Sequence, residues 1–230
     1  MTRFQFTVNM ERLFFELLQV STGRLDCFDR GPSPEEWQRL YELSKAQNVE
    51  GICYHGVELL FEFGLRAPQD VSIDWMAESE LIREKNEQVE SLPPVTDYYP
   101  EELRLLRQLG PDGVSPVKAP LTIQDVYEAF RQHRMDMRLL MDYCFCLRKT
   151  GGRHETMRHD GLMAAVKGRI GIGRFARGVM WVLQESLALE HESMPWEPLE
   201  QEGRFLLSEM TQEHRWWQRT GHSLKYLQAL

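Results

Sequence analysis

The chain contains few of the residues that favour β-strands. Its aliphatic side chains include 13 Val and 6 Ile against 29 Leu, and 25 Glu stand against 10 Asp. Val and Ile favour strands, whereas Leu and Glu are good helix formers. These proportions argue strongly against an all-β architecture, and we expect an all-α fold. The 230 residues, 42% of them hydrophobic, can bury a core in one ordinary domain or two small ones.

Cysteines and long apolar runs are also scarce. The four cysteines include no CxxC pair, a spacing typical of metal sites and redox centres. In a chain of this length they predict free thiols in a reducing compartment. No stretch approaches the roughly 18 uncharged apolar residues of a membrane span, and the most apolar N-terminal stretch, Leu13 to Val20, is interrupted by Glu16. We therefore expect a cytoplasmic protein that makes no membrane contact.

The charge is acidic overall but unevenly distributed. A net charge of −8 argues against broad nucleic-acid binding. Between Arg131 and Arg177, however, eleven Lys or Arg residues stand against four acidic ones, which gives this segment a local charge of +7 and leaves −15 for the remainder. Such a segment either docks on the acidic part of the chain or meets a phosphate-bearing ligand, and we favour docking.

Helix start and stop signals recur along the chain. Ser33, Pro34 and Glu36 form a capping box with proline at the first helical position, which predicts a helix from residue 34. Its predicted buried stripe consists of Trp37, Leu40, Tyr41 and Ser44. Similar signals predict helices over about 10–20, 52–63, 71–89, 101–109, 122–147, 154–166, 175–189, 199–219 and 223–230. In the helix over 71–89, the side chains expected to face inward are Trp75, Leu81 and Ile82.

Six of the eleven prolines lie between residues 91 and 120. Proline fixes φ and removes a backbone donor, so this stretch predicts a connector around one short helix. We accordingly divide the chain into an N-terminal helical lobe (1–92), a proline-rich connector (93–120) and a C-terminal helical lobe (121–230), and we expect the two lobes to pack together.

The motifs that could hold a metal ion do not have the required spacing between their ligand residues. His154 and His159 flank Glu155 like the ligands of a zinc protease, but they are separated by five residues instead of four. On a helix this places the two rings about 140° apart, so they cannot chelate one ion. Cys144 and Cys146 diverge on a helix in the same way and predict buried thiols. We therefore assign no metal site.

Five stretches together resemble a bacterial family of nucleotidyltransferases of the nucleotidyltransferase-5 type. They are "PSPEEWQRLYELSKAQNVEGICYHGVELL" (32–60), "WMAESELIREKNEQV" (75–89), "MRLLMDYCFCLRK" (137–149), "GIGRFARGVMWVLQESLAL" (171–189) and "EGRFLLSEM" (202–210). They follow the order of the family's helical flanking regions and cover roughly half of the chain.

The catalytic core of that family has no counterpart here. Between its helical parts the family carries a mixed sheet with a Lys-Gly turn, a glycine-rich turn and an Asp-x-Asp pair that holds Mg²⁺. None of the ten aspartates in this chain is separated from another by one residue. The only Gly-Gly pair, Gly151 and Gly152, is followed by Asp160 and then by Gly161 and Leu162 instead of a second acid. The proline-rich connector stands where the catalytic domain would be.

The resemblance thus implies a relative that keeps the helical scaffold and has lost nucleotidyl transfer. We expect a non-catalytic helical protein that acts by binding a protein partner or by self-association, with no catalytic residue and no cofactor. The candidate ligand site is an anion-binding group on the basic segment, formed by Arg131, Arg134, Arg138 and Asp142. Arg138 and Asp142 match the family's Leu-Arg-x-x-x-Asp helix, although four residues apart they would also form a simple ion pair, which we favour.

Two enzymatic alternatives remain open. The first is a divergent nucleotidyltransferase that uses Mg²⁺ and an NTP, with Glu78 and Glu80, or Glu190 and Glu192, in place of the missing aspartates. The second is a HEPN-like ribonuclease based on the spacing of Arg153 and His159. The glycine-rich turn at residues 167–173 follows no strand, so we interpret its glycines as an interhelical turn and not as a phosphate cradle.

Overall fold

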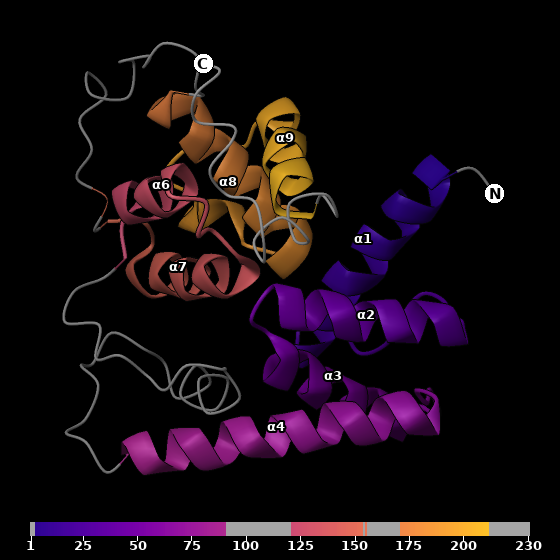
Figure 1. Cartoon of the computed structure of the whole chain (residues 1–230). Helices are drawn as coiled ribbons and strands as arrows, with labels where there is room; N and C mark the ends of the chain where they lie inside the picture. Colours follow the sequence, from indigo (N-terminus) through magenta and orange to yellow (C-terminus); the bar gives the residue numbers. More distant parts are fainter. Residues whose placement is uncertain (1–2, 91–120, 154, 156–170, 212–230) are drawn as a thin grey trace, which may run out of the picture.

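The computed structural model describes residues 3–90, 121–153, 155 and 171–211 (Figure 1). The helices there are α1 (Arg3–Ser21), α2 (Pro34–Ala46), α3 (Glu50–Glu62), α4 (Gln69–Glu90), α6 (Ile123–Arg131), α7 (Met137–Thr150), α8 (Ile172–Leu187) and α9 (Glu200–Thr211), with a short 3-10 helix at His191–Ser193. No strand occurs within these residues, and the all-α prediction is confirmed for them. The predicted connector and the predicted helices over 101–109, 154–166 and 223–230 lie outside the described residues.

The capping box predicted for α2 is present. Ser33 Oγ accepts a hydrogen bond from the backbone N–H of Glu36 at 3.3 Å, and the Glu36 carboxylate accepts one from Ser33 N at 2.8 Å. The predicted stripe of this helix is buried in full. Local chemistry and the apolar period therefore predict correctly where α2 begins and which of its faces is buried.

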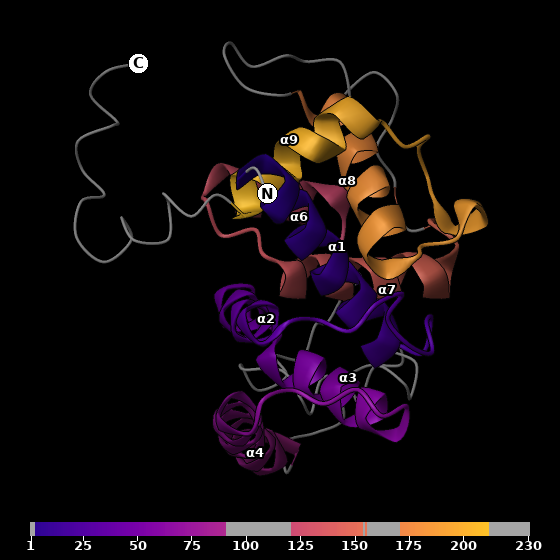
Figure 2. The ribbon, with the colours of Figure 1, turned by 90° about the vertical axis from the view of Figure 1, so that its right-hand side faces the viewer.

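Helix α1 contacts helices from both the N-terminal and the C-terminal part of the described chain. It packs against α2 and α3 on one side and against α8 on the other, while α6, α7 and α9 also pack on α8. Helix α4 lies on the far side of α3 from α1, at the edge of the molecule (Figures 1 and 2). One cluster of buried apolar side chains continues from α1 to α9. The division into lobes at the connector stays a prediction.

The single helical stretch predicted over 122–147 is wrong, because this segment forms two helices. α6 ends at Arg131 and α7 begins at Met137. Between them His133 has φ of 56°, in the left-handed region that no continuous right-handed helix contains. Asp136 then caps α7, since its Oδ1 accepts a hydrogen bond from Leu139 N at 2.9 Å. Both helices pack on α8, which explains why the apolar pattern continues through the break.

The inward position predicted for Leu81 is also wrong. Trp75, Ser79 and Ile82 form the buried face of α4 at i, i+4 and i+7. Leu81 lies two residues beyond Ser79, about 200° around the helix. Its side chain is 56% exposed.

A buried amide joins three helix ends. Gln47, the C-cap of α2, is 1% exposed. Its Oε1 accepts a hydrogen bond from Met137 N at the start of α7 at 2.9 Å, and its Nε2 donates one to the carbonyl of Met210 in α9 at 3.1 Å. Each of these groups is satisfied without water, so this side chain fixes how α2 meets α7 and α9.

Candidate functional site

The four residues predicted to bind an anion make separate local contacts. Arg131 ends α6 and pairs with Glu128 at 3.3 Å. Arg134 follows α6 and donates a hydrogen bond to Gln132 Oε1. Arg138 lies in the first turn of α7, with its Nε 3.7 Å from Asp142 Oδ2. The structure therefore brings together only Arg138 and Asp142 in a direct contact.

Arg138 is the most enclosed of the three arginines. Its side chain is 15% exposed and that of Asp142 is 17% exposed. Within the described part of the chain its Nη1 is buried and has no hydrogen-bond partner. The carboxylate of Asp136 interacts with the same guanidinium, and burial raises the pKa of Asp136. Asp142 is thus the carboxylate in direct contact with this arginine, and the anion site stays a prediction.

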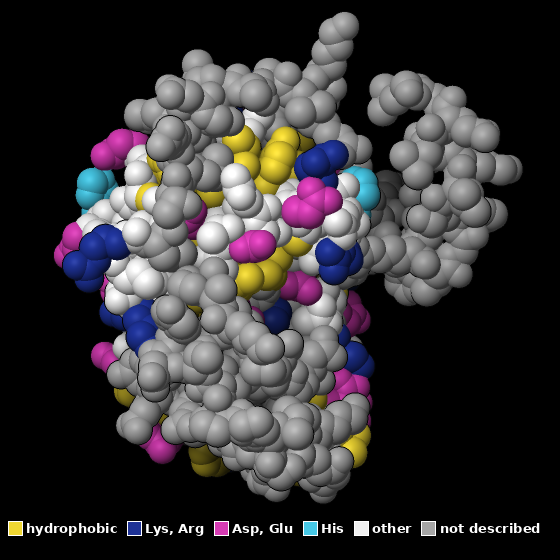
Figure 3. All heavy atoms as spheres, turned by 90° about the vertical axis from the view of Figure 1, so that its left-hand side faces the viewer, with side chains coloured by type: hydrophobic (Ala, Val, Ile, Leu, Met, Phe, Trp, Pro, Cys, Tyr) yellow, Lys and Arg dark blue, Asp and Glu magenta, His cyan; other side chains and the backbone are white. Residues whose placement is uncertain are grey.

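The surface over α6 and α7 carries charges of both signs. Figure 3 shows Lys and Arg side chains there as separate groups, interspersed with Asp and Glu. This view shows no gathered basic patch among the side chains coloured by type. His154, His159, Lys167 and Gly168, which belong to other motifs of the basic segment, lie outside the described residues.

One glutamate of each pair in the nucleotidyltransferase alternative is engaged in ion pairs. Glu78 accepts a hydrogen bond from Lys45 Nζ at 2.5 Å. Glu190 pairs with Arg148 at 2.9 Å and with Arg24 at 2.8 Å. In the described segments, no three His, Cys, Asp or Glu side chains are grouped so as to hold a metal ion. These carboxylates therefore serve contacts between helices in the structure.

The other residues considered for a catalytic role are either isolated at the surface or buried. Arg153 is exposed, and its Nε donates a hydrogen bond to the Thr150 carbonyl at 2.9 Å. Cys144 and Cys146 are both buried and free, as predicted. Burial raises the pKa of the Cys144 thiol to about 12, so this sulfur is not a nucleophile at neutral pH.

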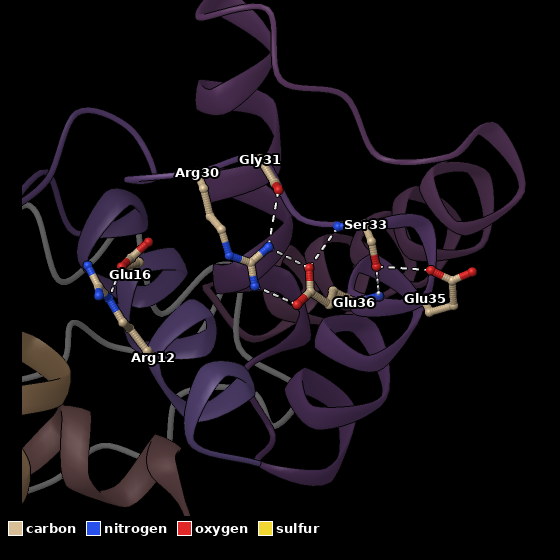
Figure 4. Close-up of polar contacts among 7 residues, drawn as sticks. All are labelled: Arg12, Glu16, Arg30, Gly31, Ser33, Glu35 and Glu36. Atoms are coloured by element: carbon tan, nitrogen blue, oxygen red, sulfur yellow. Dashed lines mark hydrogen bonds and ion pairs between the residues drawn. The ribbon is translucent and has the colours of Figure 1, made fainter. Parts of the chain in front are cut away.

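A polar cluster holds the segment between α1 and α2 (Figure 4). Arg30 donates two hydrogen bonds to the Glu36 carboxylate, at 2.7 Å and 2.5 Å. Arg12 pairs with Glu16 at 2.8 Å and also with Asp29. The hydrogen bond from Arg30 lowers the pKa of Glu36. Arg30 and the capping box thus hold the start of α2, while Arg12, Glu16 and Asp29 hold the preceding loop against α1.

Most of the exposed large hydrophobic side chains in the described residues lie on or beside α3 and α4. Five large hydrophobic side chains of α3, α4 and the segment joining them are half exposed: Phe61 at 57%, Phe63 at 57%, Ile73 at 50%, Met76 at 45% and Leu81 at 56%. We call them the α3–α4 apolar surface. Phe61 and Phe63 lie at the end of α3, where the chain turns into α4, and the other three lie between the first and fourth turns of α4. Scattered apolar side chains are normal on a protein surface. Here five of the six exposed large hydrophobic side chains in the described residues belong to one helical pair.

Acidic residues accompany this surface. Between residues 58 and 81 the chain has six acids, Glu58, Glu62, Asp70, Asp74, Glu78 and Glu80, and the single base Arg66. The guanidinium of Arg66 lies 4.5 Å from the centre of the Phe61 ring. Sequence reasoning missed the surface because Leu81 was assigned to the core. The available signal was the mismatch of Ile73 and Leu81 with the period of Trp75 and Ile82.

No family model, no curated protein and no solved structure matches the chain. The site must therefore be judged from its own chemistry. Every helix in the described ranges is too short or too polar to cross a membrane.

Proposed function

We propose that this chain is a non-catalytic, cytoplasmic helical protein that acts by binding another protein or a second copy of itself through the α3–α4 apolar surface. The single observation that carries the proposal is the half exposure of five large apolar side chains on one helical pair. Fully burying a side chain such as Phe or Ile contributes about 1.5–3 kcal/mol, so a partner that covered even part of this surface would gain considerable free energy.

The ion pairs formed by the acidic side chains support the same function. Glu78 and Glu190 bind basic side chains of neighbouring helices, and the buried Glu202 pairs with Arg174. A carboxylate held in this way is a poor ligand for a magnesium ion, because the ion would have to displace its partner. The resemblance to nucleotidyltransferase flanking helices, with the Asp-x-Asp pair missing, leads to the same proposal from the sequence side. The four free cysteines agree with a reducing compartment.

Site-specific photocrosslinking in cells tests the binding surface. A photoreactive amino acid replaces Met76 on α4 and, in the control, Gln124, which is exposed on α6. We expect crosslinked products of higher mass from position 76 and none from position 124. Equal crosslinking from both positions, or none from position 76, would refute the proposal.

A second experiment tests the absence of catalysis. The purified full-length chain is incubated with Mg²⁺ and each radiolabelled NTP, with and without cell extract as a source of acceptors. We expect no label in the protein or in any acceptor beyond that found with heat-denatured protein. Incorporation that depends on the native chain would show that it is an enzyme.

A further inference from the structure

The charges around the α3–α4 apolar surface indicate the chemistry of its partner. Three of the acids, Glu62, Asp70 and Asp74, are exposed and have no ion-pair partner among the described side chains. Glu58 is only loosely paired, with its carboxylate 3.8 Å from His55 Nδ1. These carboxylates produce a negative potential around the apolar side chains that a basic partner would complement.

The same charges argue against a second copy of the chain as the occupant. In a two-fold symmetric dimer each copy contributes the same patch, so the acidic residues of one copy would face or flank those of the other. Like charges set against each other across an interface cost several kcal/mol in general. The anionic surface of a membrane would be repelled for the same reason.

The arrangement along α4 indicates the shape of the partner. Ile73 to Leu81 covers eight residue steps, about 12 Å of helix. Ile73 and Met76 lie three residues apart on one side of α4, whereas Met76 and Leu81, five residues apart, diverge by about 140° on either flank of Ile73. A helix presents apolar side chains at i, i+3 or i+4 and i+7 over the same length, and amphipathic helices commonly bind apolar surfaces through such anchors. A partner helix laid along α4 at Ile73 and Met76 would cover these two side chains and place its flanking residues near Asp70 and Asp74.

We propose that the α3–α4 apolar surface binds an amphipathic helix of a partner protein whose apolar face is bordered by Lys and Arg. The inference rests on the proposed binding function and adds the chemistry of the partner. Apolar contact supplies affinity, and the acidic border selects basic over acidic helices and accelerates association.

Binding of designed peptides to the full-length chain, followed by fluorescence anisotropy, tests this proposal. The first probe is an amphipathic peptide of about 18 residues, long enough to form a helix, with Leu on one face and Lys on its borders. The second carries Glu in place of Lys, and the third has the composition of the first in scrambled order. We expect the first to bind at least about tenfold more tightly than either of the others, with an affinity that falls as salt is added.

Protein variants show whether binding uses this surface. Ile73→Ser together with Met76→Ser should weaken binding of the Lys peptide by about tenfold or more. Asp70→Lys together with Asp74→Lys should weaken the Lys peptide and strengthen the Glu peptide. The matched control is Phe205→Ser on α9, which removes another half-exposed apolar side chain remote from α4 and should leave binding unchanged. Circular dichroism and thermal unfolding verify that each variant folds.

Each contrary result is informative. Equal affinity for the Lys and Glu peptides, both lost in the Ile73→Ser, Met76→Ser variant, would overturn the charge selection while the binding function stands. Binding of the Lys peptide that this variant retains would reveal non-specific attraction and overturn the proposal. So would the absence of peptide binding, or a dimer that the variant dissociates. Failure of crosslinking from position 76 would instead count against the binding function itself.

Discussion

Trp181 packs directly over Gly203 where α8 meets α9. An ideal Cβ on Gly203 would lie 2.2 Å from Trp181 Cε3, well inside the contact distance of about 3.5–4.0 Å between carbon atoms. On α8, Gly178 is similarly close to α9, since its Cβ would lie 2.9 Å from that of Glu202. Glycine is unfavourable inside a helix, and the close approach of α8 and α9 explains its presence at both positions.

Gly203→Ala should therefore destabilise the protein although alanine is the better helix former. We expect a loss of about 1–3 kcal/mol in the free energy of unfolding, measured by urea denaturation, because the methyl group displaces the Trp181 ring. Gln201→Ala, at an exposed position of the same helix, should change stability by no more than about 0.5 kcal/mol. If Gly203→Ala proved neutral or stabilising, the packing of Trp181 on α9 would be incorrect.

Replacing Gln47 should cost more than its size indicates. In Gln47→Ala both Met137 N and the Met210 carbonyl lose their partner inside the protein, and each orphaned group costs about 1–3 kcal/mol. We expect urea denaturation to show a loss of at least about 2 kcal/mol. Gln47→Glu keeps an acceptor for Met137 N but cannot donate while ionised, so it should not restore wild-type stability. The exposed Gln38→Ala is the matched control in the same helix, and an equal effect there would contradict the role of Gln47.

The helices were predictable to the extent that their signals are local. Ser33 and Glu36 lie three residues apart, so the start of α2 could be determined from the sequence, and the buried stripe through Trp37 and Leu40 follows from one period. The partners of Gln47 are far away in sequence and could not be deduced from any local pattern. Leu81 was misplaced for a related reason: which face of α4 is buried depends on the position of α3.

The candidate site was correspondingly harder to predict than the fold. Sequence reasoning selected arginines because clustered charge is visible in one dimension, and the structure shows that Arg131 and Arg138 make different local contacts. The apolar surface is recognisable only once the packed faces of α3 and α4 are known. Exposure is a property of the folded chain, and a Leu or Ile in an amphipathic pattern is otherwise assigned to the core.

Substitutions of Arg138 and Asp142 can distinguish a simple ion pair from an anion-binding site. Asp142→Ala leaves the enclosed guanidinium with less compensation and should cost about 1–3 kcal/mol, whereas Arg138→Met removes a group whose Nη1 has no hydrogen-bond partner in the described structure and should cost less. Arg131→Met, in an exposed pair, should have little effect. Thermal unfolding is measured with and without inorganic phosphate. A phosphate-dependent rise in Tm that Arg138→Met abolishes would support the anion site instead.

The reactivity of each cysteine thiol should decrease with the burial of its side chain. Cys53, Cys144 and Cys146 are buried, and Cys27 is intermediate. Burial raises the pKa of Cys53 and Cys144, so neither forms an appreciable thiolate at pH 8. We expect a thiol reagent such as DTNB to react with one cysteine in the native protein and with four in urea. Cys27→Ser should remove the native reaction and Cys146→Ser should not, and rapid labelling of Cys144 in the folded chain would contradict the structure.

The Arg30–Glu36 contact predicts a defined dependence of stability on pH. Because Arg30 holds the pKa of Glu36 below its ordinary value of 4.5, the folded chain binds fewer protons than the unfolded chain in the range just below that value. The stabilisation is therefore fully present above about pH 4.5 and is lost as the pH falls through the folded pKa.

Arg30→Met should lower the free energy of unfolding by about 1 kcal/mol at pH 7, a moderate figure because the guanidinium is half exposed. Urea denaturation between pH 7 and pH 3 should show the difference from wild type shrinking below pH 4.5. Arg204→Met, whose pair with Glu200 is exposed on both sides, should differ little from wild type throughout. A loss in Arg30→Met that stayed constant down to pH 3 would assign the contribution of Arg30 to packing instead of charge.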